Sequence, residues 1–228
     1  MINRGNNNGF GNDSYTKLLL HCNGANDGTT FTDSSSSNKT VTATTVVTKT
    51  ATKVLGTASA FFNNNRSSNH FKLSLATSAD WEFGSSDFTI DFWAYVTAND
   101  VIFMKRTNGS HDMQFNTNSN KLRFYWADST GALQMHLINA TSVTTNTWHH
   151  VAVVKSGSTG YLFLDGHNET LTTNVMSTTL QDIGSGNLII GDYPLNAVVS
   201  LNGYMDEIRI SKGIARWTKS FTTPSREY

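Results

Sequence analysis

The sequence is short of charge, cysteine and long apolar runs. Only 15% of its 228 residues are charged, and 17 basic residues balance 17 acidic ones, so we expect no binding of nucleic acid. Cys22 is the single cysteine, which excludes a disulfide within the chain. No run approaches about 18 consecutive apolar residues, and residues 1–12 lack the charged and apolar regions of a secretory signal. We therefore expect neither membrane insertion nor export by a signal peptide.

Small polar residues take the place of charge. The chain holds 24 Asn, 31 Thr and 24 Ser, more than a third of its length, so its surface offers neutral hydrogen-bonding groups. Its 13 Phe, 7 Tyr and 5 Trp are enough for one large core. Residues 1–14, rich in Gly and Asn, are predicted to form a flexible N-terminal arm, and residues 15–228 a single domain.

Short apolar or alternating runs recur along the domain, separated by Gly, Asn, Asp and Ser, which is the spacing of β-strands. The two prolines, Pro194 and Pro224, interrupt almost none of them. The sequence therefore predicts an all-β fold, a two-sheet antiparallel β-sandwich of the jelly-roll kind. The predicted strands are Lys17–His21, Thr40–Thr48 with its turn, Phe71–Leu75, Phe88–Val96, Val101–Lys105, Leu122–Ala127, Gln134–Asn139, Trp148–Lys155, Tyr161–Leu164, Leu188–Gly191 and Gly203–Ile210.

The run FTIDFWAYV shows the two faces of such a strand. Phe88, Ile90 and Phe92 point one way, with Ala94 and Val96 following them. The intervening Thr, Asp, Trp and Tyr residues point the other way. One face should therefore belong to the core and the other should be partly in water.

Five segments in this order resemble the LamG-like jelly-roll domains of the concanavalin A-like lectin/glucanase superfamily: LLLHCNGANDGTTFTDSS, FGSSDFTIDFWAYV, WHHVAVVKSGSTGYLFLDG, GNLIIGDY and LNGYMDEIRISKGIARWTKSFTTP. The resemblance extends from Tyr15 to Pro224. The first block and the ISKGIARWT ending look most like the version found in phage and other viral structural proteins. The resemblance implies two stacked antiparallel sheets, with the first strand near the last.

The family usually reads HFDG where this chain has His21, Cys22, Asn23 and Gly24. If the first and last strands lie close together, Asn23, Asp27 and Asp206 would form an oxygen-rich cluster for a structural calcium ion, although an amide binds calcium more weakly than a carboxylate. The alternative is that Asp206 accepts backbone hydrogen bonds. We expect no other cofactor.

Catalysis is not expected. Glucanases of this fold carry acidic residues on one strand, and the equivalent-looking Asp87 and Asp91 have Cα atoms about 13 Å apart at about 3.3 Å per residue. Two short aspartates at that distance do not converge to the separation of about 5 to 9.5 Å that glycoside hydrolysis needs. The four glutamates are far from one another in sequence.

A carbohydrate-binding platform needs an aromatic ring beside amides and hydroxyls. Within KLRFYWAD, the candidates are Trp126, Tyr125, Arg123 and Asp128, with an amide-rich loop tip at Asn116–Asn120. Alternation puts Arg123 and Tyr125 on one face of this strand and Trp126 on the other, so Trp126 could instead extend the core. The remaining tryptophans, at 81, 93, 148 and 217, are expected to pack within the scaffold.

The resemblance to viral structural proteins implies a non-enzymatic virion structural or surface protein, made in the host cytoplasm, that acts by assembly and surface recognition. Its expected partners are other capsid or tail proteins, further copies of itself and host-surface glycans. Ile2 and Phe10 would anchor the arm to a neighbouring subunit, unless the arm is a leader without function. The alternative is a stand-alone carbohydrate-binding, lectin-like module.

Overall fold

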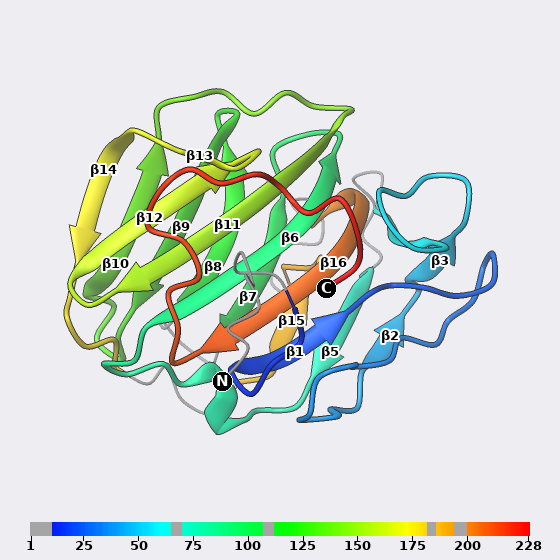
Figure 1. Ribbon diagram of the computed structural model, residues 1–228, viewed down its shortest axis with the longest axis horizontal. Helices are drawn as coiled ribbons and strands as arrows, with labels where there is room; N and C mark the ends of the chain where they lie inside the picture. Colours follow the sequence, from blue (N-terminus) through cyan, green and yellow to red (C-terminus); the bar gives the residue numbers. More distant parts are fainter. Residues whose placement is uncertain (1–10, 65–69, 107–111, 182–185, 194–199) are drawn as a thin grey trace, which may run out of the picture.

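The computed structural model describes residues 11–64, 70–106, 112–181, 186–193 and 200–228, which form two antiparallel sheets packed face to face (Figure 1). The first sheet has the strand order β13-β12-β11-β6-β16-β4-β3, and β1 also pairs with β16. Its strands are β1 (Thr16–Leu20), β3 (Val47–Lys49), β4 (Ser59–Asn63), β6 (Phe88–Val96), β11 (Trp148–Ser156), β12 (Thr159–Leu164), β13 (His167–Asn168) and β16 (Asn202–Lys212).

The second sheet has the strand order β14-β10-β9-β8-β7-β15-β5-β2. Its strands are β2 (Thr42–Thr44), β5 (Lys72–Leu75), β7 (Val101–Arg106), β8 (Asp112–Asn118), β9 (Lys121–Ala127), β10 (Leu133–Asn139), β14 (Leu171–Met176) and β15 (Leu188–Ile190). One 3-10 turn, η1 (Ala79–Trp81), precedes β6. None of the described residues forms a helix with the length and apolar composition of a membrane span.

The predicted all-β sandwich is confirmed, and so is the alternation within β6. Phe88, Ile90 and Phe92 are fully buried in the core between the sheets. Trp93 and Tyr95 point to the opposite, outer face and are partly exposed. The family-like order of strands is also present, because β1 at the start of the domain pairs with β16 at its end.

Several strands differ from the prediction. The segment Thr40–Thr48 is divided at Thr45, whose φ of 59° is left-handed, into β2 and β3 in different sheets. Strands β4, β8, β13 and β14 were not predicted. Strand β8, DMQFNTN, is rich in amides, and its last residues belong to the loop tip predicted at Asn116–Asn120. Met113 and Phe115 nevertheless alternate inward with no more than 1% exposure. Cross-strand pairing on both sides of β8 outweighs the weak intrinsic preference of its residues for a β-strand.

The end of the predicted arm is attached to the sandwich. Asp13 forms an ion pair with Arg216, with an Oδ1–Nη2 distance of 2.8 Å. The carbonyl of Gly11 accepts a 3.3 Å hydrogen bond from Arg209. Residues 11 and 13 of the predicted arm therefore contact the sandwich. Ile2 and Phe10 lie outside the described residues.

The C-terminal tail, residues 213–228, crosses the outer face of the first sheet and returns to β16 (Figure 1). Trp217 stacks on Phe221 with ring centroids 4.0 Å apart. Together with Ala152, Val154 and Phe163 they form a second, smaller core outside the sandwich. The tail therefore covers one half of the outer face.

Candidate functional site

A hollow of about 450 Å³ lies on the outer face of the second sheet, within the usual size of small-molecule sites. Strand β8 supplies one wall, because the residues that alternate with its core-facing side chains point outward. The lining residues are Asn99, Asp100, Val101, Gln114, Asn116, Thr117, Asn118, Ser119 and Tyr193. The lining is thus almost entirely neutral, with amides, hydroxyls and one aromatic ring.

Asn116 lines this hollow and contains a buried hydrogen-bond acceptor. Its side-chain Nδ2 donates a 2.6 Å hydrogen bond to Oε1 of Gln114. Its Oδ1 is buried and has no hydrogen-bond partner, although the residue is only 7% exposed. A buried polar atom without a partner costs about 1 to 3 kcal/mol, and the Oδ1 of Asn116 accepts no hydrogen bond in the described part of the chain.

A second hollow, of about 270 Å³, shares Asn118 and Ser119 with the first. Arg123 and His136 line it together. Arg123 Nε donates to His136 Nε2 over 3.2 Å. Burial and the neighbouring guanidinium lower the pKa of His136, which keeps the imidazole neutral and able to accept this hydrogen bond.

Of the four residues predicted as a carbohydrate platform, the structure brings Arg123 and Tyr125 to this face. The Arg123 guanidinium lies 4.6 Å from the centroid of the Tyr125 ring. The prediction was wrong for Trp126, which is fully buried in the core and donates from its Nε1 to the carbonyl of Gln181. It was also wrong for Asp128, whose carboxylate instead closes the β9–β10 turn.

The role of Asp128 is structural because its oxygens are occupied. Oδ1 accepts hydrogen bonds from the hydroxyl and backbone N–H of Thr130 and from the backbone N–H of Ala132. Oδ2 accepts from the amide of Gln134. The hydrogen bonds from Thr130 are the main reason that the pKa of Asp128 lies below its usual value. Asp128 shapes the turn and does not line either hollow.

The predicted calcium ligands do not form a ligand set. Asp27 pairs with Lys49 at 2.5 Å. The Oδ1 of Asn23 accepts hydrogen bonds from the backbone N–H and hydroxyl of Thr57. Asp206 accepts from three backbone N–H groups, and burial raises its pKa to about 7. These residues as placed do not fit a calcium ion, since each is engaged elsewhere and the raised pKa of Asp206 weakens it as a charged ligand.

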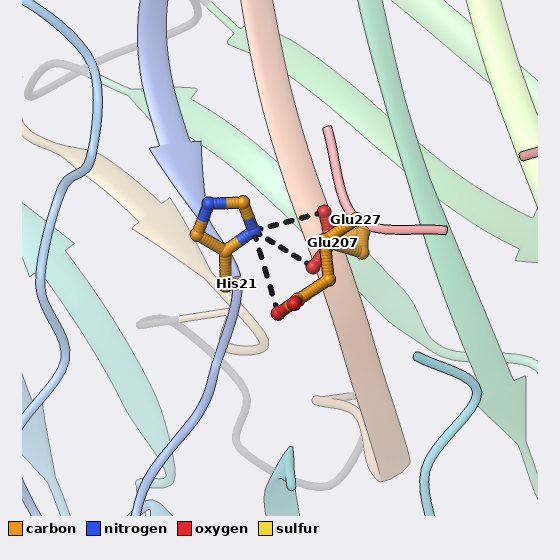
Figure 2. A group of neighbouring side chains, drawn as sticks. All are labelled: His21, Glu207 and Glu227. Atoms are coloured by element: carbon orange, nitrogen blue, oxygen red, sulfur yellow. Dashed lines mark hydrogen bonds and ion pairs between the residues drawn. The ribbon is translucent and has the colours of Figure 1, made fainter. Parts of the chain in front are cut away.

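A different cluster joins the ends of the chain. Figure 2 shows His21 at the end of β1, Glu207 on β16 and Glu227 on the tail pointing toward one another. His21 Nδ1 lies 2.8 Å from Glu207 Oε1 and 4.0 Å from Glu227 Oε1. The hydrogen bond to Glu207 raises the pKa of His21. The cluster is an ion pair that helps to hold the tail, and sequence spacing could not reveal it because 186 residues separate His21 from Glu207.

A buried charged network lies beneath the same tail. Arg209 forms two hydrogen bonds to Asp91, of 3.0 and 3.1 Å, and both side chains are fully buried. The Tyr228 hydroxyl donates to the Asp91 carboxylate, and the Arg209 guanidinium lies 3.9 Å from the centre of the Tyr228 ring. Asp91 thus has a structural partner on β16 and is not arranged with Asp87, which accepts from the backbone of Gly157.

The two antiparallel sheets packed face to face define a β-sandwich. The family model described as the concanavalin A-like lectin/glucanases superfamily, Laminin_G_3, matches residues 66–216. The chain belongs to this superfamily. No curated protein sequence gives a significant match.

Solved structures with the same fold include toxin binding domains. The binding domain of Paraclostridial Mosquitocidal Protein 1 is 14% identical with a TM-score of 0.66, covering 89% of this chain and 50% of that one. The binding domain of botulinum neurotoxin serotype G is 14% identical with a TM-score of 0.62, covering 88% and 49%. The chain thus spans about half the length of these toxin domains.

A third solved structure is matched over nearly its whole length. Domain 4 of AbnA, an extracellular arabinanase of Geobacillus stearothermophilus solved in complex with arabinotriose, is 14% identical with a TM-score of 0.58. The match covers 88% of this chain and 93% of that domain. At this identity the three likenesses show a shared fold. Two of these neighbours are binding domains, and the third is one domain of an enzyme.

Proposed function

We propose that this chain is a non-catalytic module that binds an uncharged glycan in the hollow between β7, β8 and Tyr193. The observation that carries the proposal is the nearly neutral lining of this hollow, in which two side-chain amides lie with one aromatic ring. Sugars present many hydroxyl donors and acceptors around apolar C–H faces. The amides of Gln114 and Asn116 and the ring of Tyr193 match both features.

The charge of the site also supports this assignment. Asp100 lines the first hollow, but its Oδ2 is engaged by the backbone N–H of Asn202. Arg123 lies in the adjoining hollow and hydrogen-bonds to His136. A neutral sugar therefore fits the first hollow, where hydrogen bonds provide the specificity.

The test is binding to an array of neutral oligosaccharides, followed by calorimetric titration of the strongest ligand. Asn116→Ala should weaken binding at least about tenfold, equivalent to about 1.4 kcal/mol. Asn168→Ala, at an exposed position on β13 of the other sheet, is the matched control and should bind as wild type. Equal affinities for Asn116→Ala and wild type would rule out this hollow. Release of reducing sugar from the ligand would contradict a non-catalytic role.

The same module is proposed to act on the surface of a virion, made in the host cytoplasm, alongside capsid or tail proteins and further copies of itself. This part rests on the resemblance of the first and last sequence blocks to phage and viral structural proteins. The comparison to make is particle incorporation of the full chain and of a chain beginning at Gly11, which keeps the contacts of Gly11 and Asp13 with the sandwich. Equal incorporation would exclude an assembly role for residues 1–10.

A further inference from the structure

Four aromatic side chains form a row across the outer face of the first sheet, on the opposite side of the molecule from the hollows. Trp148 on β11 pairs with Tyr95 on β6, and Tyr95 pairs with Tyr204 on β16. Tyr204 pairs in turn with Phe61 on β4. Because neighbouring strands lie about 4.8 Å apart, the row spans about 14 Å. We call these four residues the aromatic row.

The rings touch one another and remain partly exposed. Successive ring centroids are 5.9 Å apart for Trp148 and Tyr95, 5.7 Å for Tyr95 and Tyr204, and 4.7 Å for Tyr204 and Phe61. All four residues have intermediate exposure. Trp148, expected to pack within the scaffold, packs on the rings of Tyr95 and Tyr204 and is partly exposed. The tail covers the other half of this face, over Ala152 and Val154, and is not the partner of the row.

Neutral polar groups run beside the row. Asn202 on β16 pairs with Asn63 on β4, and its Nδ2 donates a 3.0 Å hydrogen bond to the hydroxyl of Thr97. Asn63 is exposed. The ammonium group of Lys49, 5.8 Å from the Phe61 ring, is paired with Asp27. The surface thus joins aromatic rings with amides and a hydroxyl and has little net charge.

We propose that the aromatic row is a second glycan-binding surface, which takes a short linear segment of an uncharged polysaccharide laid across β11, β6, β16 and β4. The C–H faces of successive sugar rings pack on the aromatic row, while their hydroxyls reach Asn63 and Asn202. A second copy of this chain is the less suitable occupant, because a stable protein interface needs about 800 Å² and about 20 to 30 residues on each side. Four partly buried rings offer far less contact area than such an interface needs.

This inference goes beyond the proposed hollow and makes the module bivalent. Two sites on opposite faces contact two glycan chains, or two parts of one chain, at once. Binding to a surface dense in glycans is then much tighter than binding to a soluble oligosaccharide, because the second contact becomes intramolecular.

The probes are soluble linear oligosaccharides of arabinan, cellulose and chitin, titrated while tryptophan fluorescence is recorded. Trp148→Ala and Phe61→Ala, at the two ends of the aromatic row, should each weaken binding of the best probe at least about tenfold. Trp148→Phe should lose less affinity, since it keeps a ring. Circular dichroism and the unfolding temperature establish that each variant is folded.

Asn116→Ala separates this inference from the proposed hollow. If both sites bind glycan, Asn116→Ala removes binding at the hollow and leaves binding at the aromatic row. Trp148→Ala has the opposite effect. If Asn116→Ala removes all binding and the row variants bind as wild type, the hollow stands and the aromatic row is not a glycan site. If only the row variants lose binding, the row stands and the hollow fails. No binding of any probe by the wild type, or a dimer that Trp148→Ala dissociates, overturns the inference.

Discussion

Replacing Asp91 with alanine should cost about 3 to 5 kcal/mol of the free energy of unfolding. The variant leaves the Arg209 guanidinium fully buried without its carboxylate, and both hydrogen bonds between them, of 3.0 and 3.1 Å, are lost. Removing one partner of a buried ion pair has a cost of about this size. It is a large part of the roughly 5 to 15 kcal/mol that stabilises a typical domain.

Urea unfolding followed by circular dichroism measures this loss. With a slope of about 2 to 3 kcal/mol/M, the midpoint should fall by about 1 to 2.5 M. The control is the double variant Asp91→Leu with Arg209→Met, which removes both charges. It should be clearly more stable than Asp91→Ala, because apolar groups of similar volume often replace a buried ion pair at little cost.

The pH dependence gives a second measurement of the same pair. Although burial raises the pKa of Asp91, the Arg209 charge and the hydrogen bonds lower it from 3.8 to about 2. The stabilisation is therefore present above pH 3.8 and is lost as the pH falls through about 2. A loss below about 1 kcal/mol for Asp91→Ala, or a double variant as unstable as the sum of the two single variants, would refute the description of a desolvated, coupled pair.

Three further outcomes are expected. Trp217→Ala removes the ring that stacks on Phe221 and should lower the free energy of unfolding by about 3 to 5 kcal/mol. Hydrogen exchange along β11 and β12 should become faster, and unchanged exchange would mean that the tail does not cover these strands. Folding raises the pKa of both Asp206 and His21, so the folded state holds protons that the unfolded chain releases. The unfolding temperature should therefore fall from about pH 5 to about pH 8. A rise over this range would contradict the raised pKa values. Asn116→Leu removes an unpartnered buried oxygen but also the hydrogen bond to Gln114, so stability should change by less than about 1 kcal/mol while glycan binding at the hollow is lost; a larger loss of stability would show that Asn116 is structural.

The position of the hollow follows from strand β8, which the sequence pattern did not predict. Its alternation is present, with Met113 and Phe115 buried and Gln114 and Asn116 on the other face. Amides at every outward position resemble a turn when the sequence is taken alone. The pairing of β8 with β7 and β9 makes it a central strand, and the same amides then become the wall of a site.

The tryptophans show the same division between local and tertiary information. Alternation along β9 correctly separates Trp126 from Arg123 and Tyr125, and the fold decides that the face of Trp126 is the core. Trp148 belongs to a strand that was predicted correctly. The role of Trp148 depends on which residues lie opposite it on neighbouring strands, and only the strand register of the folded protein determines these.

The sequence by itself determined the fold class, most strand positions and the two faces of each well-patterned strand, because these depend on residues close together in the chain. It also determined the neutral, amide-rich and hydroxyl-rich surface. The tertiary structure alone decided which strands are neighbours, which outer face the tail covers, and that His21 meets Glu207 and Asp91 meets Arg209. Those contacts join residues more than a hundred positions apart, and no local pattern encodes such a pairing.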